Sequence, residues 1–67
     1  METILRCNIY KIRLEKNYTQ EHMAIELSIS QSQYSKMERG TQKLSFETIV
    51  KIAEIFGMEV KNLLEIQ

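Results

Sequence analysis

The sequence predicts an all-α protein, built as a compact domain of five short helices. Apolar residues recur at spacings of three and four, as they do on one face of a helix. The 67 residues include no proline and only two glycines, and each glycine directly follows a predicted helix. This length allows one domain, whose core lies near the lower limit of independent stability.

The first helix is expected over residues 4–16. Its apolar positions are four and three residues apart and form one stripe: Leu5, Ile9 and Ile12. Asn17 follows, and asparagine is among the few residues besides glycine that tolerate the left-handed conformation that closes a helix.

A helix-turn-helix is expected next. Thr19 is a suitable N-cap for a helix over residues 20–27, whose apolar side is Met23, Ala24 and Leu27. The turn 28–30 leads into a third helix that begins at residue 31 and ends at 38 or 39. Ser30 and Gln33 match the S-x-x-Q capping box at its start, and Gly40 closes it.

Two further helices complete the fold. Ser45 is the expected cap of a helix over residues 46–56, which Gly57 ends. A last short helix is expected over residues 60–65. Its apolar residues are Val60, Leu63 and Leu64, and those of the preceding helix are Phe46, Ile49, Val50, Ala53 and Phe56. We assign Met23, Met37, Phe46 and Phe56 to the core.

The third helix carries small and amide side chains that a helix does not need in order to bury itself. Gln31, Ser32, Gln33 and Ser35 are groups that hydrogen-bond to base edges and phosphates, and Lys36 and Arg39 follow closely. A short polar helix on an apolar scaffold typically reads the DNA major groove. The sequence therefore predicts a DNA-binding regulator.

The charge balance qualifies this interpretation. Nine basic residues balance nine acidic ones, although a nucleic-acid binder is expected to be basic. Residues 31–44 hold Lys36, Arg39 and Lys43 against Glu38, whereas residues 45–67 are predominantly acidic. This distribution predicts modest non-specific affinity and hence a need for a second DNA-reading subunit.

Other classes of protein find little support. No catalytic Cys-His or Ser-His-Asp arrangement, glycine-rich phosphate loop or cofactor motif is evident, so an enzyme is not expected. His22 has no companion ligand for a metal, and Cys7 has no second cysteine for a disulfide. No small-molecule ligand, membrane span or signal peptide is evident, and we expect a cytoplasmic protein.

Three segments resemble the phage-repressor and Cro-like helix-turn-helix domains, also called the xenobiotic-response-element (XRE) family. They are TQEHMA, SQSQYSKMERG and LSFETIVKIAEIFGMEVKNLL. The resemblance extends over residues 9–65, so residues 1–67 are taken as one Cro/C1-type domain with the helix-turn-helix at about 19–39. It implies a lambda-repressor-like fold of five helices, with the third helix in the major groove.

The resemblance also implies roles for individual residues. The expected base contacts are Gln31, Ser32, Gln33 and Lys36, and the expected backbone contacts are Gln20, Ser35, Arg39 and Lys43. Gln33 has an alternative role in the capping box, and Arg39 has one as a solvated charge. For Arg13, an ion pair with Glu38 is preferred over a phosphate contact.

Three positions depart from the family pattern, and one of them is Glu59, which opens the last helix where a Ser or Asp cap is common. Ser28 stands where the family usually has glycine, so a serine is expected to hold a positive φ. Tyr34 replaces a residue that is usually aliphatic, and its hydroxyl needs a partner if the ring is buried.

We expect a homodimer on double-stranded DNA, acting as a sequence-specific transcriptional regulator. The expected dimer interface is the apolar group Val60, Leu63, Leu64 and Ile66, with the alternative that its leucines cover the monomer core. The alternative function is a protein-interaction module of the same fold, an antitoxin-like domain for example, which the zero net charge favours.

Overall fold

Five α-helices make up the computed structural model within residues 2–65, the part of the chain that the structure describes. They are α1 (Glu2–Glu15), α2 (Gln20–Leu27), α3 (Gln31–Arg39), α4 (Phe46–Phe56) and α5 (Val60–Leu64). The all-α prediction is confirmed, and every predicted helix lies within two residues of its expected bounds.

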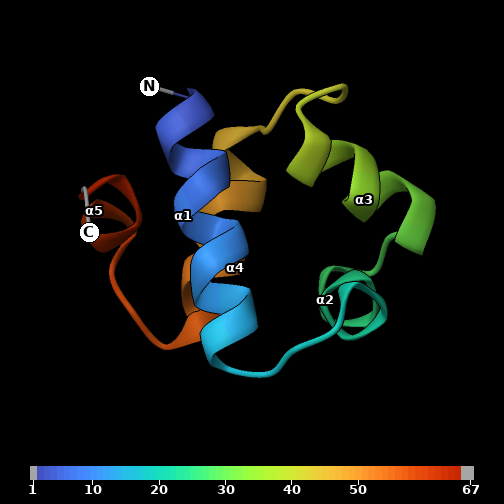
Figure 1. Ribbon diagram of the computed structural model, residues 1–67, viewed down its shortest axis with the longest axis horizontal. Helices are drawn as coiled ribbons and strands as arrows, with labels where there is room; N and C mark the ends of the chain where they lie inside the picture. Colours follow the sequence, from blue (N-terminus) through green and yellow to red (C-terminus); the bar gives the residue numbers. More distant parts are fainter. Residues whose placement is uncertain (1, 66–67) are drawn as a thin grey trace.

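α1 is the central helix and passes in front of α4 (Figure 1). α5 lies on one side of this pair, and the helix-turn-helix formed by α2 and α3 lies on the other. α1 packs against α3, α4 and α5, while α2 packs against α3 and α4. The helix-turn-helix is therefore held at one edge of the molecule by both central helices.

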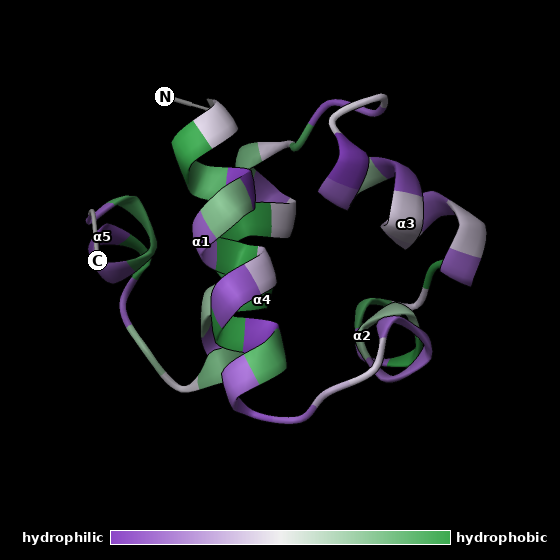
Figure 2. Ribbon diagram, in the orientation of Figure 1, coloured by the Kyte–Doolittle hydropathy of each residue, from purple (hydrophilic) through white to green (hydrophobic). Residues whose placement is uncertain are grey.

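The core is built from the apolar stripes of all five helices and one loop residue. Figure 2 shows these stripes most clearly on α1 and α4, whereas α3 is mainly hydrophilic. The buried apolar residues are Leu5, Ile9, Ile12, Met23, Ala24, Leu27, Tyr34, Met37, Leu44, Ile52, Ala53, Phe56 and Leu63. The expected stripe of α1 and the apolar side of α2 are confirmed by this burial.

Each of the first four helices ends at a residue with positive φ: Asn17 (60°), Ser28 (59°), Gly40 (86°) and Gly57 (71°). In each case this residue and the next donate backbone hydrogen bonds to carbonyls of the preceding turn, as in a Schellman motif. For α2, Ser28 N donates to Ile25 O and Ile29 N donates to Ala24 O. The expectation that Ser28 holds the left-handed conformation is confirmed.

Phe46 is not a core residue, and this prediction was wrong. Its side chain is 73% exposed, although it stands seven residues before the buried Ala53 and so on the same face of α4. Helical side chains lean toward the N-terminus of their helix. Because Phe46 is the first residue of α4, its ring leans past the end of the helix, beyond the core.

The short helix α5 is attached to α1 by a buried side chain that sequence analysis did not identify. Asn8 is 4% exposed, and its Nδ2 donates to Leu63 O at 2.7 Å and to Glu65 O at 2.6 Å. These carbonyls lie at the C-terminal end of α5, where no further helical N–H can reach them. Asn8 thus caps α5 from a helix 55 residues earlier in the chain.

Candidate DNA interface

The start of α3 is fixed by a reciprocal capping box. Ser30 Oγ accepts a hydrogen bond from Gln33 N at 3.1 Å, and Gln33 Oε1 accepts one from Ser30 N at 3.1 Å. Ser30 itself is extended, with φ −77° and ψ 156°. The predicted capping box is confirmed, and it satisfies two backbone donors on either side of the point where the chain enters the helix.

α3 separates its buried and exposed sides sharply. Tyr34 and Met37 are buried and face α1 and the rest of the core. The outward side chains of α3 are polar: Gln31, Ser32, Gln33, Lys36 and Arg39 are exposed, and Ser35 is half-buried. All four expected base-contacting side chains therefore reach solvent together from one short helix.

A carboxylate at the end of α3 connects three helices. Glu38 receives two hydrogen bonds from Arg13 in α1, from Nε to Oε2 at 2.6 Å and from Nη2 to Oε1 at 3.2 Å. The Tyr34 hydroxyl donates to Oε2 at 2.7 Å, and Gln20 Nε2 in α2 donates to Oε1 at 3.0 Å. The ion pair expected from the family pattern is present, and the Tyr34 hydroxyl has its partner.

Arg13 is almost enclosed, with 7% of its surface exposed. Its Nη1 donates to Tyr18 O at 2.8 Å, in the segment between α1 and α2. Its guanidinium carbon lies 5.5 Å from the centroid of the Tyr10 ring. Arg13 is thus committed to contacts inside the molecule, as its preferred role in an ion pair requires.

These contacts shift the acid–base behaviour of the network. Burial by itself raises the pKa of Glu38, but the hydrogen bonds from Arg13, Tyr34 and Gln20 outweigh burial and lower the pKa below its ordinary value. Burial, followed by the bond to Glu38, raises the pKa of the Tyr34 phenol. The hydrogen bond to Glu38 raises the pKa of Arg13. A charged carboxylate between a cation and a neutral phenol is therefore the favoured state.

Gln20 has a contact that sequence analysis missed. Sequence analysis expected only a backbone phosphate contact for it, yet its amide nitrogen already donates to Glu38. An amide nitrogen carries two N–H groups, so one of them is left for a phosphate. Glu38 lies 18 residues after Gln20, in the other helix of the helix-turn-helix. No local sequence pattern relates two residues this far apart, so the contact could not be predicted from the sequence.

The C-terminal end of α3 carries more positive charge than sequence analysis assigned to it. Arg39 and Lys43 are exposed there. Arg6 in α1 lies over the same end, because a Cβ placed on Gly40 would stand 2.7 Å from its guanidinium carbon. Arg6 is seven residues before Arg13 and so shares its face of α1, a spacing that would have predicted proximity to α3.

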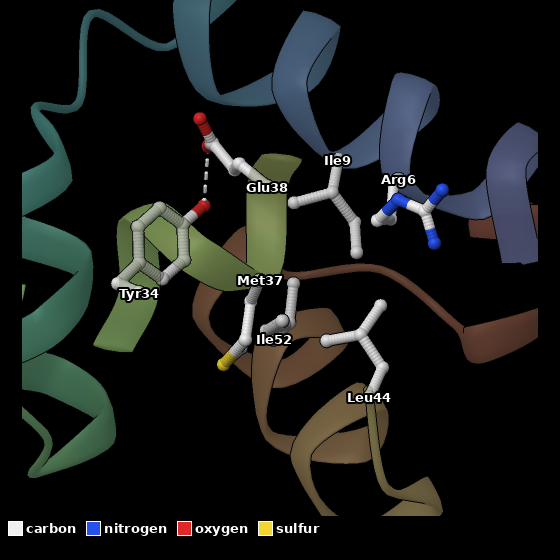
Figure 3. A pocket seen from close by; sticks show the side chains of 7 residues that line it. All are labelled: Arg6, Ile9, Tyr34, Met37, Glu38, Leu44 and Ile52. Carbon is white, nitrogen blue, oxygen red and sulfur yellow. Dashed lines mark hydrogen bonds between the residues drawn. The ribbon is translucent and has the colours of Figure 1, made fainter. Parts of the chain in front are cut away.

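The cavity drawn in Figure 3 lies beneath α3 and is too small for an organic ligand. Its volume is about 10 Å³, close to the space of one water molecule. It is lined by Arg6, Ile9, Tyr34, Met37, Glu38, Leu44 and Ile52. The Arg6 guanidinium points away from the apolar side chains, and the dashed line marks the bond from Tyr34 to Glu38 (Figure 3).

The model of the family described as "Helix-turn-helix" matches residues 9–62, which include α2, α3 and α4 completely. The chain belongs to the helix-turn-helix family. The predicted membership of the Cro/C1-like branch is confirmed by its relatives, and this helix-turn-helix protein is a DNA-binding transcriptional regulator.

Two curated relatives and one solved structure illustrate the likeness. The chain is 38% identical over 58 residues to control protein C.BamHI of Bacillus amyloliquefaciens, covering 85% of this chain and 72% of that protein. It is 31% identical over 55 residues to the cryptic phage CTXphi transcriptional repressor RstR of Vibrio cholerae, covering 82% of this chain and 50% of the repressor. The clp gene regulator ClgR of C. glutamicum has the same fold, with a TM-score of 0.85 at 24% identity over 94% of this chain and 82% of that chain.

The expected dimer-interface residues of this helix-turn-helix protein differ in how far they are buried. Leu63 is fully buried with 0% exposure, so it covers the monomer core, as the alternative for the leucines has it, and its assignment to the dimer interface was wrong. Val60 is half-buried against the core, whereas Leu64 is 40% exposed. Ile66 lies outside the described residues. Leu64 is thus the one described member of this group that offers a large exposed apolar side chain.

His22 and Cys7, the other residues considered for special chemistry in this helix-turn-helix protein, have no partner residues for metal binding or a disulfide among the described residues. His22 packs its ring on Tyr18, with centroids 4.5 Å apart, and Cys7 is exposed. Within residues 2–65 no group of three or more His, Cys, Asp or Glu side chains is arranged to hold a metal ion. None of the described helices has the length and apolar character needed to cross a membrane.

Proposed function

We propose that this regulator binds a two-fold DNA operator as a homodimer, with α3 of each subunit in the major groove. The observation that supports it is the construction of α3. Its buried side is fixed to α1 and α2 through the Glu38 network, while its outward side carries only polar and basic groups. A rigid helix with a free polar face is what direct reading of bases requires.

In this proposal the first two turns of α3 read the bases. Gln31, Ser32, Gln33 and Lys36 are exposed there, with hydrogen-bonding groups of matching chemistry for the major groove. An amide side chain whose oxygen and nitrogen are both free pairs with adenine through N6 and N7, and lysine donates to guanine or to phosphate. Discrimination between operators would arise at these four positions.

The flanks of α3 hold the sugar-phosphate backbone. Gln20 at the start of α2 offers its second amide N–H, and Ser35, Arg39 and Lys43 lie along or just after α3. Such contacts set the orientation of the protein on the duplex and carry no base preference of their own.

Two subunits are proposed because one domain with zero net charge has little general attraction for DNA. In a dimer the two α3 helices would enter successive major grooves about 34–36 Å apart. The exposed side chain of Leu64 on α5, far from α3, is available for the contact between subunits. We expect a regulator of this kind to act in the cytoplasm, without a catalytic step.

Selection from a pool of random duplexes, followed by sequencing, tests the proposal. The expected product is a site with two related half-sites about 10–10.5 base pairs apart between centres. Binding of the selected duplex, followed by fluorescence anisotropy, should weaken steeply as salt rises. A pool that stays random through repeated rounds would exclude sequence-specific binding.

The alternative is a protein-interaction module, and two exposed apolar side chains favour it. Phe46 is 73% exposed and Ile25 is 67% exposed, the two highest values among the large apolar side chains of the described residues. If the selected pool stays random, a Phe46→Ser variant can test whether an isolated partner protein binds through this residue. If the pool converges on a two-fold site, the alternative is unnecessary.

A further inference from the structure

Two glutamines near the start of α3 present different hydrogen-bonding groups to a ligand. Both Gln31 and Gln33 are exposed. No hydrogen bond within the described chain engages the Gln31 amide, so its oxygen and its nitrogen are both available. The oxygen of Gln33, in contrast, is already in use inside the capping box.

The Gln33 oxygen has little acceptor capacity left. Gln33 Oε1 accepts from Ser30 N at 3.1 Å, and Ser30 Oγ lies 3.4 Å away as a second donor. The bond from Ser30 N uses one of the two lone pairs of this carbonyl oxygen, and the longer contact from Ser30 Oγ is directed at the same oxygen. The amide nitrogen is on the far side of the same rigid group and makes no hydrogen bond within the described residues, so Gln33 presents to solvent chiefly its two N–H donors.

The bases differ in the hydrogen-bonding groups that they present to such a side chain. In the major groove guanine presents two adjacent acceptors, N7 and O6, whereas adenine presents one acceptor beside one donor. Cytosine presents a donor, which would face the donors of Gln33 directly, and thymine presents the single acceptor O4, so guanine alone has an acceptor for each of the two donors. Gln31, with oxygen and nitrogen both free, suits adenine instead.

We propose that Gln33 is a guanine-reading residue, and that the capping box sets this preference by sequestering its oxygen. This inference rests on the proposed function, because it requires α3 to lie in the major groove. The helix cap then has a second role, since it decides which hydrogen-bonding pattern the side chain shows to DNA.

A Gln33→Glu variant separates the two roles. Glutamate keeps the acceptor for Ser30 N, since Ser/Thr-x-x-Glu is also a capping box, but it has no amide donors. The variant should therefore fold normally, with a thermal midpoint close to that of the parent. Duplex selection is carried out with the parent, with Gln33→Glu and with Gln31→Ala as the matched control.

The parent should select guanine at one position of each half-site, with roughly tenfold or greater discrimination against other bases. Gln33→Glu should lose that preference, or replace guanine by cytosine, whose N4 donates to a carboxylate. Gln31→Ala should leave the guanine position unchanged and relax a different one.

Three outcomes would overturn the inference while leaving the proposed function intact. The parent could select a two-fold site in which the position that depends on residue 33 is not guanine. Gln33→Glu could keep the parental guanine preference. It could also weaken all duplexes equally, as a simple added negative charge would. A parent that selects no sequence would instead remove the proposed function, and the inference with it.

Discussion

Tyr34 and Glu38 stand one turn apart in α3, and the Tyr34 hydroxyl donates a 2.7 Å hydrogen bond to the Glu38 carboxylate. The same carboxylate accepts bonds from Arg13 in α1 and Gln20 in α2. A single acidic side chain therefore sets the position of the proposed reading helix relative to the two helices that pack against it. Two predictions about stability depend on this carboxylate.

Protonation of Glu38 should destabilise the protein. Because its folded pKa is lower than the unfolded value of about 4.3, Glu38 contributes stability above pH ~4.3 and loses it as pH falls through the folded pKa. A Glu38→Gln variant lacks this dependence. Thermal unfolding followed by circular dichroism at pH 7, 5, 4 and 3 should show the difference in midpoint between parent and variant shrinking below about pH 4. A difference that is constant over this range would contradict the assignment.

The contributions of Arg13 and Glu38 to stability should depend on each other. Their side chains are 8% and 7% exposed, so removing one leaves a nearly buried charge without its partner. Arg13→Ala and Glu38→Ala should each lower the free energy of unfolding by about 3–5 kcal/mol. The double variant should lose less than the sum of the two, as measured by urea unfolding. If both single variants unfold like the parent and only Arg13→Ala weakens DNA binding, Arg13 is a phosphate contact instead.

Replacing Ser28 by glycine should stabilise the protein. A non-glycine residue in the left-handed region pays a conformational cost, and Ser28 has φ 59°. Ser28→Gly should raise the free energy of unfolding by about 0.5–1 kcal/mol, after allowance for the greater freedom of glycine in the unfolded chain. Ser28→Ala serves as the control and should give no gain, since alanine keeps the same strain. Equal stability of the glycine and alanine variants would show that this corner is not strained.

Leu63 and Leu64 form a matched pair for separating core from interface. Leu63 is fully buried, so Leu63→Ala should cost about 2–5 kcal/mol of stability. Leu64 is 40% exposed, so Leu64→Ala should change monomer stability little. Sedimentation equilibrium at tens of micromolar should nevertheless show that Leu64→Ala weakens the dimer. A parent that sediments as a clean monomer and binds DNA one to one would reject dimerisation.

Lys43 and Gln31 should affect DNA binding in different ways. Lys43→Ala should weaken all sequences about equally and reduce the salt slope by about one unit. Gln31→Ala should cost about 1–3 kcal/mol on the selected site and relax one base position. Lys61→Ala, which removes the same charge from α5 on the other side of α1, is the control and should leave the salt slope unchanged. A sequence-dependent effect of Lys43→Ala would mean that it reads bases.

Local patterns predicted most of this fold. The spacing of Leu5, Ile9 and Ile12 identified the buried face of α1, and Ser30 with Gln33 identified the start of α3. Such signals are visible in sequence because the interacting groups are at most one or two turns apart. Asn17 was recognisable for the same reason, as a left-handed residue at a helix end.

Contacts between distant helices were predicted less well. Nothing near Asn8 indicates that it caps a helix more than fifty residues later, and nothing near Gln20 indicates the carboxylate of Glu38. The burial of two residues near helix ends was also predicted wrongly: Phe46 is exposed and Leu63 is buried. Helical spacing does not distinguish a covered residue from an uncovered one at such a position. Their burial depends on whether another element covers that end, which periodicity does not report.

The bonds from Asn8 to the far end of the chain have a consequence for synthesis. Glu65 O, one of the two acceptors, is 57 residues after Asn8, so this closure must wait until that residue has been made. At about 5–20 residues per second a ribosome needs roughly 3–11 s to travel that distance. During that time α1 exists without the helix that covers one of its sides. The nascent chain must therefore avoid aggregation while part of the apolar surface of α1 is exposed. α5 can cover that surface only after it has left the ribosome.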